Sequence, residues 1–232
     1  MKEILKNIYW LLGQGFDCNV YIIESNQEAI MIDTGAGSAL SQGFSTTSSN
    51  IEILRQVIAN KNVNHIFLTH GHIDHIGGIL SIQSEVDCMI SASVAEALQL
   101  STGNSPYLDP IMNSTCSPLK ISKKFGEGDN IVVGDYHFQV FETPGHTKGS
   151  LSLYEHDKKI LISGDTVFPQ GSFGRTDLPS GSSQELLKSL ERLSNLQICV
   201  LLPGHMPPVI SESPLNSVRD SYRNAQMMLS YY

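Results

Sequence analysis

The chain has 232 residues, 41% of them hydrophobic and 16% charged, which is the composition of an ordinary globular protein rather than a disordered one. This length fits one large α/β domain over residues 1–232 better than two small domains. The formal net charge of -8 and the absence of any run of basic residues argue against a nucleic-acid partner. We therefore expect a small-molecule substrate, and a homodimer stays an open alternative.

The cysteines and the N-terminal segment indicate the compartment. The cysteines form neither a C-x-x-C pair nor the spacing of a small secreted domain, so we expect buried or partly buried free thiols. The N-terminal apolar stretch is short and broken by charges, which predicts no signal peptide, and no segment approaches the roughly 20 apolar residues of a membrane span. The expected location is the cytoplasm, without membrane attachment. The four cysteines are Cys18, Cys88, Cys116 and Cys199.

Short apolar runs between turn residues predict the elements of the first half. A Ser-, Thr- and Gly-rich connection follows at 37–50, and the irregular stretch 101–128 is a candidate substrate-facing loop. The motif Ser93-x-x-Glu96 is a capping box, which predicts a helix that starts at Ser93. The other expected elements are strands at 20–24, 29–32, 65–68 and 88–90, and helices at 51–59 and 76–82.

The second half of the chain shows the same alternation of short apolar runs and turn residues. A Gly- and Ser-rich loop at 168–182 precedes a helix that Ser182-x-x-Glu185 caps and that continues through Leu193. Residues 213–232 are expected to form a closing helix. Two similar α/β halves predict two sheets between helices, a four-layer αββα sandwich. The remaining expected strands are 131–133, 137–141, 150–154, 159–163 and 198–202.

One short segment concentrates metal-binding side chains. Residues 69–78 read THGHIDHIGG and directly follow a predicted buried strand. Imidazole and carboxylate are ligand types for zinc, iron and manganese. The glycine between His70 and His72 permits a turn in which both converge on one metal, while Asp74 and His75 begin the next turn and suit a second metal. The alternative is a polar turn that contains histidine by chance. This alternative could account for a single histidine, but the complete H-x-H-x-D-H string makes it improbable.

Three further donors follow predicted strands later in the chain. His146, Asp165 and His205 each lie just beyond an apolar run, and a glycine comes immediately before each of them. Together with the H-x-H-x-D-H segment, they indicate a metal site at one edge of a sheet.

With these motifs, the sequence resembles the metallo-β-lactamase superfamily. The early residues 32–35, reading IDTG, resemble the first motif of that family, and the metal-binding motifs extend over residues 70–205. Within the superfamily, residues 143–150 (TPGHTKGS) and 171–177 (GSFGRTD) are most similar to glyoxalase II-like thioester hydrolases and their persulfide dioxygenase relatives.

The resemblance implies two divalent metal ions, zinc first, with iron or manganese as alternatives, and a bridging hydroxide as the nucleophile. It also implies that Asp74 orients the nucleophile or shuttles a proton. The implied ligands are His70, His72 and His146 for one ion, Asp74, His75 and His205 for the other, and Asp165 between the two.

Three other residues could belong to the site, and each of them also has an ordinary structural explanation. Asp33 either caps a turn or accepts a hydrogen bond from a ligand histidine. Arg175 either grips a substrate carboxylate or pairs locally with Asp177. Tyr107 either lines the pocket or is an ordinary exposed loop tyrosine.

Several functions stay open at this point. The first is hydrolysis of a small thioester, such as an acyl-glutathione. The second is persulfide oxidation by one iron on His70, His146 and Asp165, a two-histidine, one-carboxylate triad. A lactonase or other ester hydrolase is a third enzyme, and a metal-binding scaffold without catalysis is the non-enzymatic alternative. Only a short segment follows His205, where glyoxalase II has a helical domain that grips glutathione, so glutathione itself is in doubt.

Overall fold

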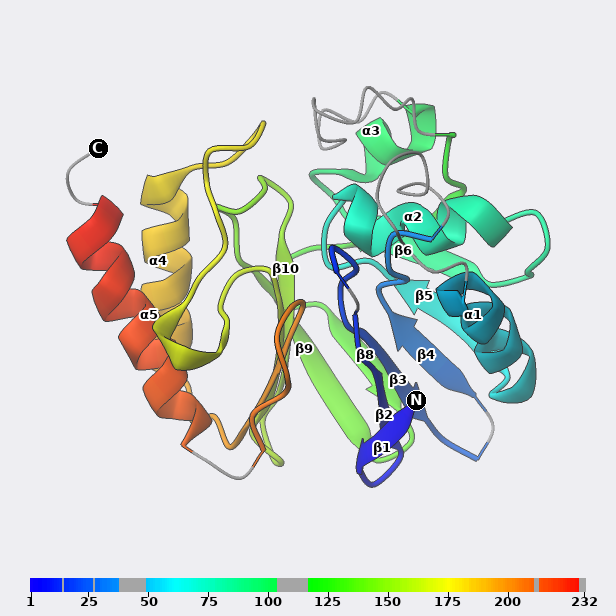
Figure 1. The fold of residues 1–232 in the computed structure, drawn as a ribbon, viewed down its shortest axis with the longest axis horizontal. Coiled ribbons are helices and arrows are strands. Elements are labelled where there is room, and N and C mark those ends of the chain that lie inside the picture. The colour runs from blue at the N-terminus through cyan, green and yellow to red at the C-terminus, as the bar shows by residue number, and fades with distance from the viewer. Residues whose placement is uncertain (14, 27, 38–48, 104–116, 211–212, 230–232) are drawn as a thin grey trace. The chain divides into compact units, whose positions relative to one another are not determined.

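The computed structural model describes residues 1–13, 15–26, 28–37, 49–103, 117–210 and 213–229 (Figure 1). The chain divides into two compact units, which are described one at a time. The first contains Met1–Phe125 and Val132–Tyr136, and the second contains Gly126–Ile131 and His137–Tyr232. None of the helices in the described ranges combines the length and the apolar character needed to cross a membrane.

The first unit is built on a seven-stranded sheet whose strands follow one another in chain order. The pairs from β1 to β4 are antiparallel, and those from β4 to β7 are parallel. Parallel neighbours need a crossover, and the helices supply it. The strands are β1 (Lys2–Leu5), β2 (Ile8–Leu11), β3 (Val20–Glu24), β4 (Ala29–Ile32), β5 (Val63–Phe67), β6 (Met89–Ser93) and β7 (Ile121–Phe125), and the helices are α1 (Ser49–Asn60), α2 (Ile73–Ile82) and α3 (Ala97–Thr102).

The core of the first unit lies between the sheet and α1 and α2. Figure 1 shows both helices on one side of the sheet. Leu54 of α1 and Ile76 and Ile79 of α2 pack with Ile66 of β5, and all four are buried. Full burial of one such side chain stabilises the fold by about 1.5–3 kcal/mol, so this core fixes α2 against the end of β5.

The second sheet has the strand order β12-β11-β10-β9-β8. Strand β12 pairs in parallel with β11, and α4 provides the crossover between them. Ser182 caps α4 by accepting a hydrogen bond from the Glu185 amide, and α4 and α5 lie side by side (Figure 1). The elements are β8 (Asn130–Val133), β9 (Tyr136–Glu142), β10 (Leu151–Glu155), β11 (Ile160–Gly164), a 3-10 turn (Pro169–Gly171), α4 (Ser183–Ser194), β12 (Val200–Pro203) and α5 (Pro214–Leu229).

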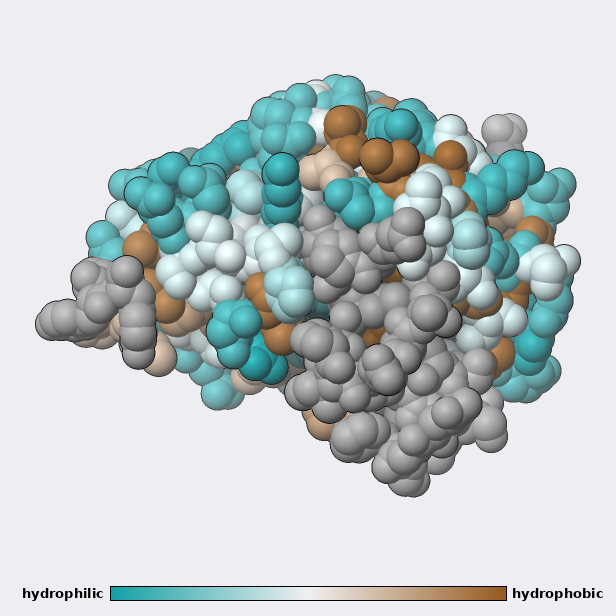
Figure 2. Space-filling view, turned by 90° about the horizontal axis from the view of Figure 1, so that it is seen from above, coloured by the Kyte–Doolittle hydropathy of each residue, from teal (hydrophilic) through white to brown (hydrophobic). Residues whose placement is uncertain are grey.

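Hydrophilic and hydrophobic side chains share the face drawn in Figure 2, where teal surrounds separate brown patches. Exposed apolar side chains of the first unit include Phe16, Val94 and Leu98. Single apolar side chains of this kind are normal on a protein surface.

The mixed α/β fold with two sheets is confirmed, whereas the expectation of one domain over residues 1–232 stays a prediction. Strands β3 and β4 have the expected bounds, and the helix after Ser182 is confirmed. The closing helix ends at Leu229 within the described residues. Cys18 and Cys88 are free thiols that are buried and partly buried, as expected, whereas the free thiol Cys199 is exposed and Cys116 lies outside the described residues.

Two expectations on the elements between residues 93 and 128 were wrong. The helix expected to start at Ser93 starts at Ala97, because β6 continues through Ser93. The capping hydrogen bond from the Glu96 amide to the Ser93 hydroxyl is nevertheless present, at 3.1 Å. The stretch 101–128 is not irregular throughout, since it contains β7, and its part at 104–116 lies outside the described residues.

Candidate metal centre

The histidine-rich segment of the first unit connects β5 to α2. His70, His72 and His75 are all buried, and Asp74 is partly buried. Helix α2 starts at Ile73 rather than at Ile76 as expected, so Asp74 and His75 lie in its first turn. The sharp change from strand to helix therefore gathers four donors within one short connection.

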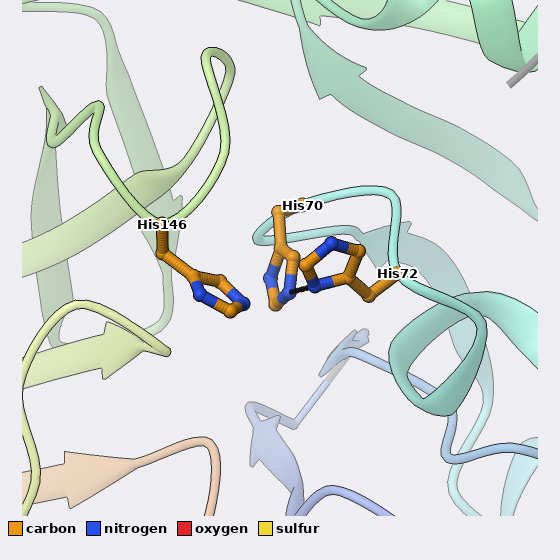
Figure 3. Close-up of side chains that lie close together, drawn as sticks. All are labelled: His70, His72 and His146. Atoms are coloured by element: carbon orange, nitrogen blue, oxygen red, sulfur yellow. Dashed lines mark hydrogen bonds between the residues drawn. The ribbon is translucent and has the colours of Figure 1, made fainter. Parts of the chain in front are cut away.

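His70 and His72 present their imidazoles to each other. His70 Nε2 lies 3.1 Å from His72 Nδ1, a contact that Figure 3 draws as a dashed line. Two nitrogen ligands at about 2.0–2.1 Å on a tetrahedral ion are about 3.3 Å apart. The pair therefore has close to the spacing of two ligands on one ion, and the Thr69 hydroxyl contacts the other nitrogen of His70 at 3.1 Å.

His75 is held by groups that precede the ligand segment in the chain. Its Nδ1 lies 2.8 Å from Asp33 Oδ2, and Asp33 also accepts hydrogen bonds from the amide and the hydroxyl of Thr69. The Asp33 contact fixes the ring so that Nε2 is the nitrogen presented to a metal. Nε2 of His75 lies 3.7 Å from Asp74 Oδ2, which also suits two ligands of one ion. The hydrogen bond expected between Asp33 and a ligand histidine is thus in place.

Cys18 is the third donor near Asp33 and His75. Donor atoms of these three buried side chains lie within 4.8 Å of one another. Burial raises the pKa of the Cys18 thiol to about 12, although His75 lowers it, so the thiol is neutral at pH 7. Because Asp33 is already engaged with Thr69 and His75, we interpret this cluster as support for His75 rather than as a metal site.

The second unit supplies its donors from three strand ends. His146 follows β9, Asp165 follows β11 and His205 follows β12. Asp165 Oδ2 lies 3.5 Å from Nε2 of His146 and 3.4 Å from Nε2 of His205. One carboxylate oxygen therefore faces two imidazoles, the arrangement expected of a carboxylate that links two ions. In Figure 3, the His146 side chain extends from a loop that is separate from the segment with His70 and His72.

Two glycines allow the backbone of the second unit to pack tightly around these donors. Gly145, directly before His146, has a φ of 137°, and a Cβ there would lie 2.3 Å from the backbone of Leu186. A Cβ on Gly174 would lie 1.9 Å from the carbonyl oxygen of Asp165 and 3.1 Å from the His146 ring. The carbonyl of the next residue, Arg175, lies 2.7 Å from His146 Nδ1, so this loop orients the imidazole.

Arg175 and Tyr107 were expected to bind the substrate or to have only a local role. Arg175 makes two hydrogen bonds of 2.7 Å to the carboxylate of Asp177, so the expected local pair is present. The pair lowers the pKa of the Asp177 carboxyl to about 2, mainly through the hydrogen bond from Arg175. Tyr107 lies outside the described residues. Sequence reasoning assigned no role to Thr34, which the structure places against His75.

The donor set fits a divalent metal. Neutral imidazoles and carboxylates suit zinc, iron and manganese, and burial reduces the competition from water. His75 and His146 each have Nδ1 hydrogen-bonded to a protein oxygen, the usual arrangement for histidines that bind a metal through Nε2.

Comparison with known proteins identifies the family. The model of the metallo-beta-lactamase superfamily matches residues 13–205, a range that includes every donor described above. The chain belongs to the metallo-beta-lactamase superfamily. The recognised resemblance is thereby confirmed.

Three relatives show how this superfamily member compares in sequence. It is 34% identical to an uncharacterized protein of Aquifex aeolicus, over 82% of this chain and 83% of that protein. It is 32% identical to the probable metallo-hydrolase YqgX of Bacillus subtilis, over 85% and 90% of the two chains. It is 27% identical to the hydroxyacylglutathione hydrolase GloC of Haemophilus influenzae, over 75% and 76%.

Solved structures agree on the fold. The BLEG-1 B3 metallo-beta-lactamase has a TM-score of 0.67 at 27% identity, covering 87% of this chain and 93% of that one. The protein TTHA1623 in a di-iron-bound form has a TM-score of 0.65 at 24% identity, covering 87% and 94%. ETHE1 from Myxococcus xanthus has a TM-score of 0.63 at 22% identity, covering 94% and 82%.

Proposed function

We propose that this protein is a dinuclear metal-dependent hydrolase that cleaves a small thioester. The observation that carries the proposal is the complete donor set, in which every expected metal ligand is present and paired at ligand spacing within its own unit. The thioester is supported by the relative GloC, named a hydroxyacylglutathione hydrolase. The family membership supports a metallo-hydrolase in general.

The family motifs assign the donors to two ions, and the spacings within each unit support that assignment. The spacing of His70 and His72 supports one ion, and the spacing of Asp74 and His75 supports the other. Asp165 faces both of its neighbouring histidines and is the proposed link between the ions. From the family motifs, the proposed ligands are His70, His72 and His146 for the first ion, Asp74, His75 and His205 for the second, and Asp165 for both.

The chemistry of a thioester hydrolase assigns tasks to the side chains. When bound, two divalent cations make hydroxide available near neutral pH and polarise the substrate carbonyl. Hydrolysis adds water across the acyl carbon–sulfur bond and releases a thiol and a carboxylic acid, which loses its proton to the solvent at neutral pH. Asp74, as the proposed proton shuttle, accepts the proton of the attacking water and returns it to the departing sulfur. Asp33 and the Arg175 carbonyl keep the ligand imidazoles of His75 and His146 in one orientation throughout.

Zinc is the proposed metal, with iron and manganese as the alternatives that the same donors accept. We propose a small substrate rather than a nucleic acid, which the net charge of -8 supports. A cytoplasmic location is proposed as well, since the free thiols of the described cysteines agree with a reducing compartment. Homodimer formation remains a proposal that gel filtration can test.

A second candidate function is persulfide oxidation by one iron. It is supported by the distance of 3.5 Å between His146 Nε2 and Asp165 Oδ2, two members of the triad proposed with His70.

One experiment separates the two functions. Protein purified without added metal is analysed for zinc, iron and manganese, and the same sample is assayed with an acyl-glutathione, with a glutathione-free acyl thioester and with glutathione persulfide under oxygen. Close to two ions per chain with thioester cleavage supports the hydrolase. One iron per chain with oxygen uptake on the persulfide and no thioester cleavage refutes it in favour of the dioxygenase.

A further inference from the structure

We propose that Thr34 is a positioning residue that sets the metal affinity of the Asp74–His75 position without affecting the His70–His72 position. The inference rests on the proposed dinuclear site. Thr34 follows β4, is buried, and is separated in sequence by 41 residues from the ligand that it contacts.

Thr34 bonds the backbone of His75 through two groups. Its amide and its hydroxyl each donate to the carbonyl oxygen of His75, both at 2.8 Å. The Ile79 amide in turn donates to the Thr34 hydroxyl oxygen at 3.1 Å. An α-helix pairs the carbonyl of one residue with the amide four positions later, which here means His75 and Ile79. The hydroxyl therefore lies between two groups that the first turns of α2 normally pair directly.

The preceding residue holds the same ligand by its ring. Asp33 contacts Nδ1 of His75 at 2.8 Å, while Thr34 bonds the His75 carbonyl. Consecutive residues thus fix both the side chain and the backbone of one ligand. Asp33 has a φ of 58°, a left-handed conformation that is rare for a residue other than glycine and that is maintained only where surrounding contacts determine it. This turn therefore has a defined geometry that serves His75.

Close packing makes this contact possible. A Cβ on Gly78 would lie 2.1 Å from the carbonyl oxygen of Thr34, so only glycine lets α2 approach this closely. The Gly78 amide also donates to the Gly35 carbonyl at 2.8 Å. Within the described part of the chain, the hydrogen bonds of Thr34 go to α2, whose first turn carries Asp74 and His75. The His72 carbonyl accepts the His75 and Ile76 amides, but the rings of His70 and His72 contact each other, and the His70 ring also contacts the Thr69 hydroxyl rather than Thr34.

A selective effect follows from this geometry. Loss of a group that orients a metal ligand typically weakens metal binding 10- to 100-fold. Replacement of Thr34 by valine keeps the shape but leaves the His75 carbonyl and the Ile79 amide without the bridging hydroxyl. We therefore expect the Asp74–His75 position to lose about 10- to 100-fold in zinc affinity, and the His70–His72 position to keep its affinity.

The test measures zinc binding to each position separately. One background, His70→Ala with His72→Ala, leaves the Asp74–His75 position. The other, Asp74→Ala with His205→Ala, leaves the His70–His72 position. Metal-free proteins in both backgrounds are titrated with zinc against a competing chelator, with Thr34, Thr34→Val or Thr34→Ser. We expect Thr34→Val to weaken binding about 10- to 100-fold in the first background alone, and Thr34→Ser, which keeps the hydroxyl, to restore it.

Three results overturn the inference: unchanged zinc affinity in the first background, equal losses in both, or a serine variant as weak as the valine variant. If Thr34→Val does not fold, as judged by circular dichroism, Thr34→Ala takes its place in the same comparison. The readout is metal affinity, so the inference and the proposed substrate fail separately. A wild-type protein that binds two zinc ions but cleaves no thioester refutes the substrate and leaves the role of Thr34 intact.

Discussion

Substitution of Gly174 by alanine tests how tightly the loop at 171–177 is packed against the donors of the second unit. The added Cβ would lie 1.9 Å from the carbonyl oxygen of Asp165, about 1.5 Å short of the 3.4 Å at which ordinary contact begins. The obstructing atom belongs to the backbone, so rotation of a side chain cannot relieve the clash. The loop must move away from Asp165, and the Arg175 carbonyl that orients His146 moves with it.

The cost has a structural and a functional part. Overpacking of a tight site typically costs about 1–3 kcal/mol of unfolding free energy. For a chain of this size, each kcal/mol lowers the melting temperature by about 2–4 °C, which gives a fall of roughly 2–12 °C. A displacement of about 1 Å at a catalytic site can reduce the rate about 100-fold. We expect Gly174→Ala to show both effects, together with a lower metal content.

The measurements are thermal unfolding of the metal-free protein, metal content and turnover of the thioester. Ser172→Ala is the matched control, because Ser172 is exposed in the same loop and the substitution adds no atoms. A Gly174→Ala protein that matches this control in all three measurements would refute the packing argument.

Further predictions concern the ligands, the loop arginine and a buried histidine. We expect His72→Ala and Asp165→Ala each to abolish thioester turnover and to lower the metal content measured by elemental analysis; full activity in either would remove that residue from the site. Arg175→Ala should raise KM for an acyl-glutathione several-fold and leave kcat nearly unchanged, and an unchanged KM would leave Arg175 with its local pair alone. Burial lowers the pKa of His65 from 6.5 to about 4, so the folded state resists its protonation. The stability that this neutral histidine provides is complete above about pH 6.5 and is lost as the pH falls toward 4. At 1.36 kcal/mol per pKa unit the loss approaches roughly 3 kcal/mol. Urea unfolding of the metal-free proteins should show this acid loss in the wild type and a smaller one in His65→Gln, and parallel curves would contradict it.

The candidate donors could be found in the sequence because His70, His146, Asp165 and His205 each follow an apolar strand, although these strands belong to two sheets rather than to the one sheet edge expected. The capping motif at Ser182 was equally readable, since its partner Glu185 is only three residues away. Such features depend on local spacing, which a single sequence displays directly.

Other features were not readable because they depend on distant partners. The hairpin of β1 and β2 was not predicted from the sequence, because Lys2, Glu3 and Lys6 interrupt its apolar pattern. Thr34 contacts a residue that is 41 positions away in sequence, so the motif at 32–35 does not show which residue Thr34 bonds. At Ser93 the capping hydrogen bond forms although the strand continues through that residue, so a correct local motif gave a wrong helix start.

The residue at the N-cap of α2 is not one of the types that usually stabilise a helix start. His72 occupies the N-cap position without a side-chain capping hydrogen bond, whereas Ser, Thr, Asp or Asn there is typically worth about 1 kcal/mol. A proposed metal ligand thus occupies a position where a capping residue would stabilise the helix. In the metal-free protein, the first turn of α2 should therefore fray, with amide hydrogens at Asp74 and His75 exchanging faster than those near Ile79. Efforts to make this protein more heat-resistant should leave that helix start alone and improve caps elsewhere.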